Sequence, residues 1–236
     1  MKYADTTFEL KRFALTDTRC GLKLGTDGML LGAWTRLPAG TRRICDAGAG
    51  CGIIGLMLAQ RYPSVEVDAV ESQPGACADA ALNFDRSPWA SRLHVHCADV
   101  TALTGRYDAL VSNPPYFTTG ERAPEAARAA ARHAGTLSPA WLVEHARDLL
   151  VPGGSLSLIM PADMEADIIC RATFARMYPR RICRVHSRPG KGAVRVLVEL
   201  RTDDGPIDTT SLMLREADGT PTADYIALFQ DFYLKL

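Results

Sequence analysis

The chain has 236 residues, of which 47% are hydrophobic and 23% are charged, and its 27 Lys and Arg residues balance 27 Asp and Glu residues. These values are typical of a soluble globular protein, and the zero net charge argues against a non-specific nucleic-acid binder. No apolar run reaches the roughly 18 residues that a membrane-spanning helix needs, and polar residues interrupt the opening stretch MKYADTTFEL. We therefore expect a cytoplasmic protein with no membrane partner.

The cysteines are scattered along the chain, and no two of them form a CxxC pair. Without that spacing, neither a zinc site nor a disulfide framework is predicted. We expect all of them to be reduced and to act as small apolar residues, and we expect no metal ion in the site.

In chain order, short apolar runs alternate with longer helical stretches, which predicts an α/β fold with a doubly wound, Rossmann-like and mostly parallel sheet. Only a basic glycine turn, residues 188–192, separates the last two predicted strands, which therefore form an antiparallel hairpin at the sheet edge. The predicted strands span residues 43–46, 65–70, 93–97, 107–111, 155–160, 182–186 and 193–200, and the predicted helices span residues 53–60, 74–83, 139–150 and 162–177.

Two segments lie outside the predicted core of residues 43–201. Residues 1–42 are an N-terminal extension, and residues 202–236 are a C-terminal tail whose helical spacing near its end predicts that it packs on the core. Within the core, the stretch 117–137 is less regular, and only its alanine-rich part, 123–134, has the composition of a helix.

A glycine-rich turn, DAGAGCG at residues 46–52, follows the first predicted strand. Gly48 and Gly50 let the backbone approach a ligand closely, and the next helix presents free N–H groups. Nicotinamide and flavin enzymes use a similar turn, so the glycines do not identify the ligand. Asp46 narrows the choice, because a fixed carboxylate would repel a pyrophosphate but would accept a cationic sulfonium compound with an α-amino group. Helix capping is the alternative role for Asp46.

Two further acidic residues end the next two predicted strands. Glu71 ends the second strand, where a carboxylate can accept hydrogen bonds from both hydroxyls of an adenosine ribose. Asp99 ends the third strand, where it can accept from an adenine amino group, although a lone acid there is equally typical of a turn.

The fourth predicted strand runs directly into Asn113-Pro114-Pro115-Tyr116. The two prolines fix the chain and remove two N–H donors, which leaves carbonyl oxygens facing the cleft. The side-chain oxygen of Asn113 and the carbonyl of Pro114 then provide two acceptors for one planar amino group, whose lone pair is freed to attack a methyl carbon in line. Tyr116 supplies a face on which a base can stack, worth about 1–3 kcal/mol. The motif therefore predicts methyl transfer to an amino nitrogen.

The segment from residue 171 to residue 201 carries nine Lys or Arg residues and a single acid, Glu199. A local basic face of this kind can bind RNA phosphates even in a neutral chain, and a solvated surface on the last strands is the alternative. The expected phosphate contacts are Arg181, Arg184 and Lys191, together with Lys11, Arg12 and Arg19.

The order of these motifs resembles the amino-nitrogen group of class I S-adenosylmethionine-dependent methyltransferases over most of residues 40–200. A closer resemblance covers almost the whole chain. GLKLGTDGMLLGAW before the glycine turn, NPPYF and ARH after it, and the closing YIALFQDFYLKL are similar to the bacterial tRNA1(Val) adenine-37 N6-methyltransferases. The resemblance implies that the cofactor is S-adenosylmethionine, that the partner is a valine tRNA, and that the adenine next to the anticodon is methylated on N6.

The resemblance also assigns roles to individual residues. Lys23, Thr26 and Asp27 match the segment that covers the methionine end of the cofactor, and this role rests on the resemblance alone. The other matched positions are Asp46, Gly48, Gly50, Glu71, Asp99 and Asn113 for the cofactor, Asn113, Pro114, Pro115 and Tyr116 for catalysis, and Tyr116 and Phe117 for the substrate. His133 is a further expected substrate contact, because it is the histidine of the irregular stretch that follows the Asn-Pro-Pro-Tyr motif.

Several alternatives stay open at the level of sequence. Methyltransferases acting on a protein glutamine amide or on guanine N2 of ribosomal RNA have similar planar targets, so NPPY does not separate them from the tRNA enzymes. A NAD-binding oxidoreductase would explain the glycine turn and Glu71 but leaves Asp46 and NPPY unexplained. A non-catalytic RNA-binding module would explain only the basic segment.

Overall fold

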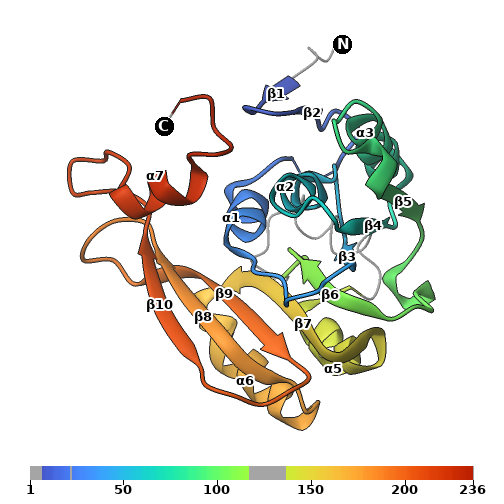
Figure 1. The fold of residues 1–236 in the computed structure, drawn as a ribbon. Coiled ribbons are helices and arrows are strands. Elements are labelled where there is room, and N and C mark those ends of the chain that lie inside the picture. Colours follow the sequence, from blue (N-terminus) through green and yellow to red (C-terminus); the bar gives the residue numbers. More distant parts are fainter. Residues whose placement is uncertain (1–6, 22, 117–136, 236) are drawn as a thin grey trace, which may run out of the picture.

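The computed structural model describes residues 7–21, 23–116 and 137–235. Its helices and strands alternate through the first part of the chain, as predicted (Figure 1). The helices are α1 Thr26–Trp34, α2 Ile53–Arg61, α3 Pro74–Asp85, α5 Pro139–Leu149, α6 Glu165–Phe174 and α7 Ala223–Phe229. The strands are β1 Thr7–Glu9, β2 Ala14–Thr16, β3 Arg43–Ala47, β4 Glu66–Glu71, β5 Leu93–Cys97, β6 Tyr107–Ser112, β7 Leu150–Pro161, β8 Tyr178–His186, β9 Ala193–Arg201 and β10 Asp208–Met213.

Eight of these strands form one sheet in the order β10-β8-β9-β7-β6-β3-β4-β5, and β1 pairs with β2 in a separate hairpin. The pairs from β7 through β6, β3 and β4 to β5 are parallel, whereas β9 runs antiparallel to both β7 and β8. The predicted α/β, mostly parallel architecture with a late antiparallel hairpin is confirmed.

Helices cover both faces of the sheet (Figure 1). Alternate residues of β3 enter two different apolar clusters: Ile44 packs with residues of α1 and α2, and Cys45 packs with residues of α5 and α6. A parallel strand that is covered on both faces needs apolar side chains at successive positions, which is why β3 and its neighbours are recognisable as apolar runs.

The later part of the sheet differs from the prediction in three places. β7 begins at Leu150, which pairs with Tyr107, and residues 151–154 form a bulge before the regular part, 155–160, that the sequence indicates. β8 begins at Tyr178, earlier than predicted, and α6 ends at Phe174. β10 was not predicted, because its sequence DTTSLM is mostly polar; it pairs in parallel with β8 and covers the outer edge of the hairpin.

Buried polar side chains of α3 hold the segment that precedes α1. Asp79 accepts hydrogen bonds from the backbone N–H groups of Arg19 and Cys20, at 2.6 and 3.1 Å. Asn83 accepts from the N–H of Thr16 at 2.8 Å and donates to its carbonyl at the same distance. The segment before α1 is therefore held against α3.

No helix in the described ranges is long and apolar enough to cross a membrane.

Candidate functional site

A cavity of about 540 Å³ lies at the carboxyl ends of β3, β4, β5 and β6. The carboxyl edge of a parallel sheet is the usual ligand site of doubly wound folds. The predicted site residues that line the cavity are Lys23, Gly48, Gly50, Glu71, Asp99, Asn113 and Pro115, and Arg19, Cys20, Gln73 and Leu137 line it as well.

The glycine turn forms one wall of this cavity. Gly50 has a φ of +56°, and a Cβ placed on it would meet no atom within 4 Å, so its backbone faces open space. Gly52 has a φ of +84°, and a Cβ there would lie 2.5 Å from the Phe84 ring. Gly50 therefore leaves room for a ligand, whereas Gly52 is required for packing against α3.

Asp46 lies behind the turn and is fully buried. Its Oδ2 accepts a hydrogen bond from the N–H of Gly55 at 3.0 Å, and its Oδ1 has no hydrogen-bond partner among the described residues. Burial raises the pKa of Asp46 to about 7; the Gly55 hydrogen bond opposes this shift, and the charge of Glu71 adds to it. A buried acceptor with a free oxygen is suited to a cationic group.

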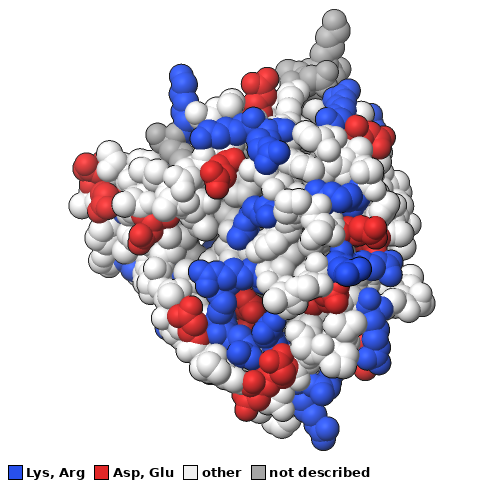
Figure 2. Space-filling model, in the orientation of Figure 1, with Lys and Arg blue, Asp and Glu red and all other residues white. Residues whose placement is uncertain are grey.

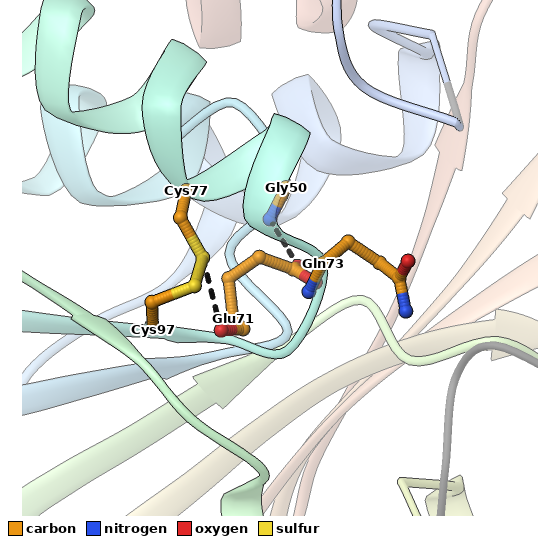
Figure 3. The surroundings of a disulfide bond; sticks show 5 residues. All are labelled: Gly50, Glu71, Gln73, Cys77 and Cys97. Atoms are coloured by element: carbon orange, nitrogen blue, oxygen red, sulfur yellow. Dashed lines mark hydrogen bonds between the residues drawn. A yellow bond between two sulfur atoms is a disulfide. The ribbon is translucent and has the colours of Figure 1, made fainter.

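Glu71 and Asp99 line the cavity next to the glycine turn. Glu71 accepts hydrogen bonds from the N–H of Gly50 at 2.9 Å and from the N–H of Gln73 at 2.8 Å (Figure 3). Asp99 accepts from the backbone N–H of Thr101 at 2.9 Å and from its hydroxyl at 2.7 Å. Asp99 therefore has the turn role that the sequence left open, and it also lines the cavity.

Asn113 follows β6 and lines the cavity. Its side-chain Oδ1 is buried and has no hydrogen-bond partner within the described part of the chain. Ser112, one position earlier, donates a 2.6 Å hydrogen bond to the carbonyl of Ala47 and so ties β6 to β3. The acceptor is thus held on a rigid strand end, where an incoming N–H donor would satisfy it.

Of the three predicted cofactor residues around the start of α1, one lines the cavity and two do not. Lys23 lines the cavity, and its ammonium group donates to the Asp17 carbonyl at 2.7 Å. Thr26 and Asp27 are not among the lining residues. Asp27 instead accepts hydrogen bonds from the Tyr116 hydroxyl and from Arg195, a residue that the sequence analysis did not assign to the site.

Six of the nine basic residues in segment 171–201 are paired with carboxylates, four of them with acids from elsewhere in the chain and two with the segment's own Glu199. Arg181 bonds to Glu199 at 3.1 Å and covers the Trp34 ring at 4.0 Å, and Arg184 bonds to Glu165 through two nitrogens. Figure 2 shows acidic side chains set among the basic ones on this face of the molecule. The basic residues with carboxylate partners are Arg171, Arg180, Arg181, Arg184, Arg195 and Arg201.

Two cysteines correct the expectation that all thiols are reduced. Cys77 of α3 and Cys97 of β5 are joined in a disulfide with their Cα atoms 5.7 Å apart (Figure 3). The bridge lies beside the cavity wall, since the Cys77 sulfur is 3.2 Å from the carbonyl oxygen of Glu71. Spacing could not indicate the pair, because the contact arises only when α3 crosses from β4 to β5.

Two predicted substrate residues, Phe117 and His133, lie outside the described residues.

Comparison with known proteins supplies the family context of this site. Residues 28–179 match the family model of the methyltransferase small domain. A tRNA1(Val) (adenine(37)-N6)-methyltransferase from Tolumonas auensis is 40% identical over 232 residues, which are 98% of this chain and 98% of the relative. A protein of the same name from Aeromonas hydrophila is 39% identical and covers 97% of this chain and 98% of its own.

Solved structures share the fold. A predicted O-methyltransferase from Agrobacterium tumefaciens has a TM-score of 0.68 at 26% identity, covering 87% of this chain and 96% of that chain. The Pyrococcus horikoshii protein TYW2, in complex with MeSAdo, has a TM-score of 0.57 at 15% identity, covering 85% of this chain and 72% of that chain. The family model and the two relatives are methyltransferases, so the oxidoreductase alternative is not favoured.

Proposed function

This chain belongs to the family of tRNA1(Val) (adenine(37)-N6)-methyltransferases, and on that premise we propose that it transfers a methyl group from S-adenosylmethionine to N6 of adenine 37 in a valine tRNA. Because tRNA is the substrate, we expect the protein to work in the cytoplasm.

The observation that carries this proposal is the buried Oδ1 of Asn113, which lines the cavity and has no hydrogen-bond partner among the described residues. An exocyclic amine on a base is a poor nucleophile, because its lone pair is delocalised into the ring. If Asn113 Oδ1 and the carbonyl of Pro114 accept its two N–H bonds, the nitrogen becomes pyramidal and its lone pair can point at an electrophile. Positioning of this kind can supply a large share of the reduction in activation free energy that an enzyme achieves.

The residues around the cavity fit S-adenosylmethionine in charge and in hydrogen-bonding groups. Asp46 is buried behind the glycine turn and is not itself a lining residue. Its Oδ1, which has no hydrogen-bond partner among the described residues, would receive the cationic methionine end, and the lining residues Glu71 and Asp99 would receive the ribose hydroxyls and the adenine amino group. Gly48 and Gly50 have no side chains, so their backbone would lie close to the ligand, and Lys23 would contact the methionine end of the cofactor. When bound, the cofactor supplies an electrophilic methyl group on a sulfonium centre.

The residues assigned to the substrate follow Asn113 in the sequence. Tyr116 would stack on the target adenine, which must leave its neighbours in the RNA at a cost of a few kcal/mol. Phe117 and His133 are proposed as further contacts with the anticodon loop.

Strand register divides the basic segment into two groups. Pro161, at the end of β7, pairs with Arg195 near the start of β9. Since β7 runs parallel to β6, the start of β9 lies at the carboxyl ends of the parallel strands, as Asn113 does. The turn that contains Arg188 and Lys191 comes directly before that start, so it extends from the substrate edge. Ser155 pairs with Arg201 at the far edge. We therefore propose that Lys191 and Arg188 contact tRNA phosphates, and that Arg181 and Arg184 do so only by exchanging their carboxylate partners.

A direct test is methyl transfer from tritiated S-adenosylmethionine to an unmodified tRNA1(Val) transcript, followed by nucleoside analysis. The matched substrate carries guanine at position 37, and the matched variant is Asn113→Ala. Label in N6-methyladenosine that requires both adenine 37 and Asn113 supports the function. Label that persists with guanine at position 37 would refute the assigned target. Absence of label from tRNA, with the cofactor still bound, would redirect the search to ribosomal RNA and protein glutamine.

A further inference from the structure

Three segments of the chain meet at the phenol of Tyr116. Its hydroxyl donates to Oδ2 of Asp27, and the same oxygen accepts a 2.8 Å hydrogen bond from Nε of Arg195. The guanidinium carbon of Arg195 also lies 5.5 Å from the centre of the Tyr116 ring. Asp27 comes from the first turn of α1, Tyr116 from the loop after β6, and Arg195 from β9, so the contact joins parts that are far apart in sequence.

The surroundings favour a persistent contact. The side chains of Arg195 and Asp27 are only 32% and 20% exposed, so water competes weakly for the ion pair. The N-terminal position of Asp27 in α1 places its carboxylate at the positive end of the helix dipole. Burial raises the pKa of the Tyr116 phenol, and the hydrogen bond to Asp27 raises it further, so the hydroxyl remains a donor at neutral pH.

We propose that Asp27 and Arg195 are positioning residues that fix the ring of Tyr116 in the orientation needed to stack the target base. This inference rests on the proposed function. Tyr116 lies in the loop after β6; it is not among the residues that line the cavity, and it packs against the apolar cluster that contains Cys45 and Leu110. A ring on such a loop can rotate about two side-chain bonds, whereas a stacked base must be held within a fraction of an ångström for transfer.

A spectroscopic experiment tests the contact itself. Tyrosines are replaced by 3-fluorotyrosine, and the ¹⁹F signal of Tyr116 is assigned by its loss in Tyr116→Phe. We expect Asp27→Asn and Arg195→Gln each to shift this signal and to narrow it toward that of a freely rotating ring. Unchanged signals in both variants would overturn the proposal.

A kinetic experiment tests the consequence. Tyr116→Phe, which keeps the ring, and Arg195→Gln should each lower the single-turnover rate about 10- to 100-fold while the Kd for S-adenosylmethionine stays constant. The double variant should be no slower than either single variant, because both act through one ring. A transcript with 2-aminopurine at position 37 should show less fluorescence quenching with either variant.

The outcomes separate the rival explanations. Arg43→Gln is the matched control, because Arg43 is also bound to an aspartate, Asp68, and lies 4.9 Å from the ring of Tyr107, away from the cavity lining. It should lower Tm without changing the rate. Additive losses with a reduced salt dependence of tRNA affinity would make Arg195 a phosphate contact and would overturn the proposal. If the ¹⁹F signals respond as expected but the wild type does not methylate tRNA, the proposed function fails while the contact stands.

Discussion

The backbone N–H of Gly50 donates a 2.9 Å hydrogen bond to the carboxylate of Glu71, which makes the turn after β3 and the end of β4 one continuous surface. The second oxygen of the same carboxylate accepts from Gln73 at the start of α3. Glu71 is therefore already oriented before any ligand binds, and the ordering cost that a free carboxylate would have is avoided.

Replacing Glu71 with alanine should weaken S-adenosylmethionine binding by more than about tenfold, since hydrogen bonds to a charged group contribute about 1.5–3 kcal/mol. Isothermal titration calorimetry measures this change. Glu66→Ala is the control, because Glu66 is exposed at the opposite end of the same strand. Equal affinities for Glu71→Ala and Glu66→Ala would remove Glu71 from the cofactor site.

The raised pKa of Asp46 predicts a pH dependence of cofactor binding. With a pKa of about 7, the carboxyl group is largely neutral at pH 6 and largely ionised at pH 8, and only the ionised form attracts a cationic ligand. We expect affinity to increase through about pH 7 in the wild type, with proton release on binding. Asp46→Asn should lose this step, and a step that persists in the variant would assign the titration to another group.

The same carboxyl group predicts how stability changes with pH. Between its ordinary value and about 7, folded Asp46 holds a proton that the unfolded chain has released, so the free energy of unfolding decreases as pH rises through that window. Urea denaturation at several pH values measures the slope. The decline should be smaller in Asp46→Asn, and an equal slope in both proteins would contradict the assignment.

The disulfide predicts a redox-dependent stability. Cys77 and Cys97 are separated by 20 positions, and closing a loop of this size stabilises a protein by about 3 kcal/mol in the chain-entropy model. A reductant should lower the free energy of unfolding by that amount, measured by urea denaturation. Cys77→Ser should be insensitive to the reductant, and a wild type equally insensitive would show that the thiols are unpaired in solution.

Charge reversal in the turn between β8 and β9 should weaken tRNA binding. Arg188→Glu and Lys191→Glu are each expected to reduce affinity and to lower the slope of log K against log salt by about one. Filter binding at several salt concentrations measures both quantities. Arg180→Glu is the control, since Arg180 pairs with Asp203 and lies near the far edge of the sheet. A uniform loss for all three variants would indicate non-specific electrostatics instead.

The parts of this protein that sequence alone determined are local. The glycine turn, the acid at the end of β4 and the Asn-Pro-Pro-Tyr loop each need particular backbone conformations and particular donors or acceptors within a few residues. Because parallel strands place their carboxyl ends at one edge, the order of these motifs was enough to predict that Gly50, Glu71 and Asn113 share one cavity.

Tertiary structure decided which charges and thiols remain available. The basic segment 171–201 contains one acid, Glu199, which pairs with two of its arginines. Four more arginines have carboxylate partners because Asp27, Glu144, Glu165 and Asp203 approach the segment from other elements. The bond from Arg195 to Asp27 spans 168 positions, and the Cys77–Cys97 bridge joins a helix to the following strand. Such pairs form between elements that pack against each other in the folded chain, and the spacing of residues along the sequence does not indicate which elements pack together. The chemistry of the loops could therefore be predicted from the sequence, whereas the partners of Asp27, Arg195 and Cys77 could not.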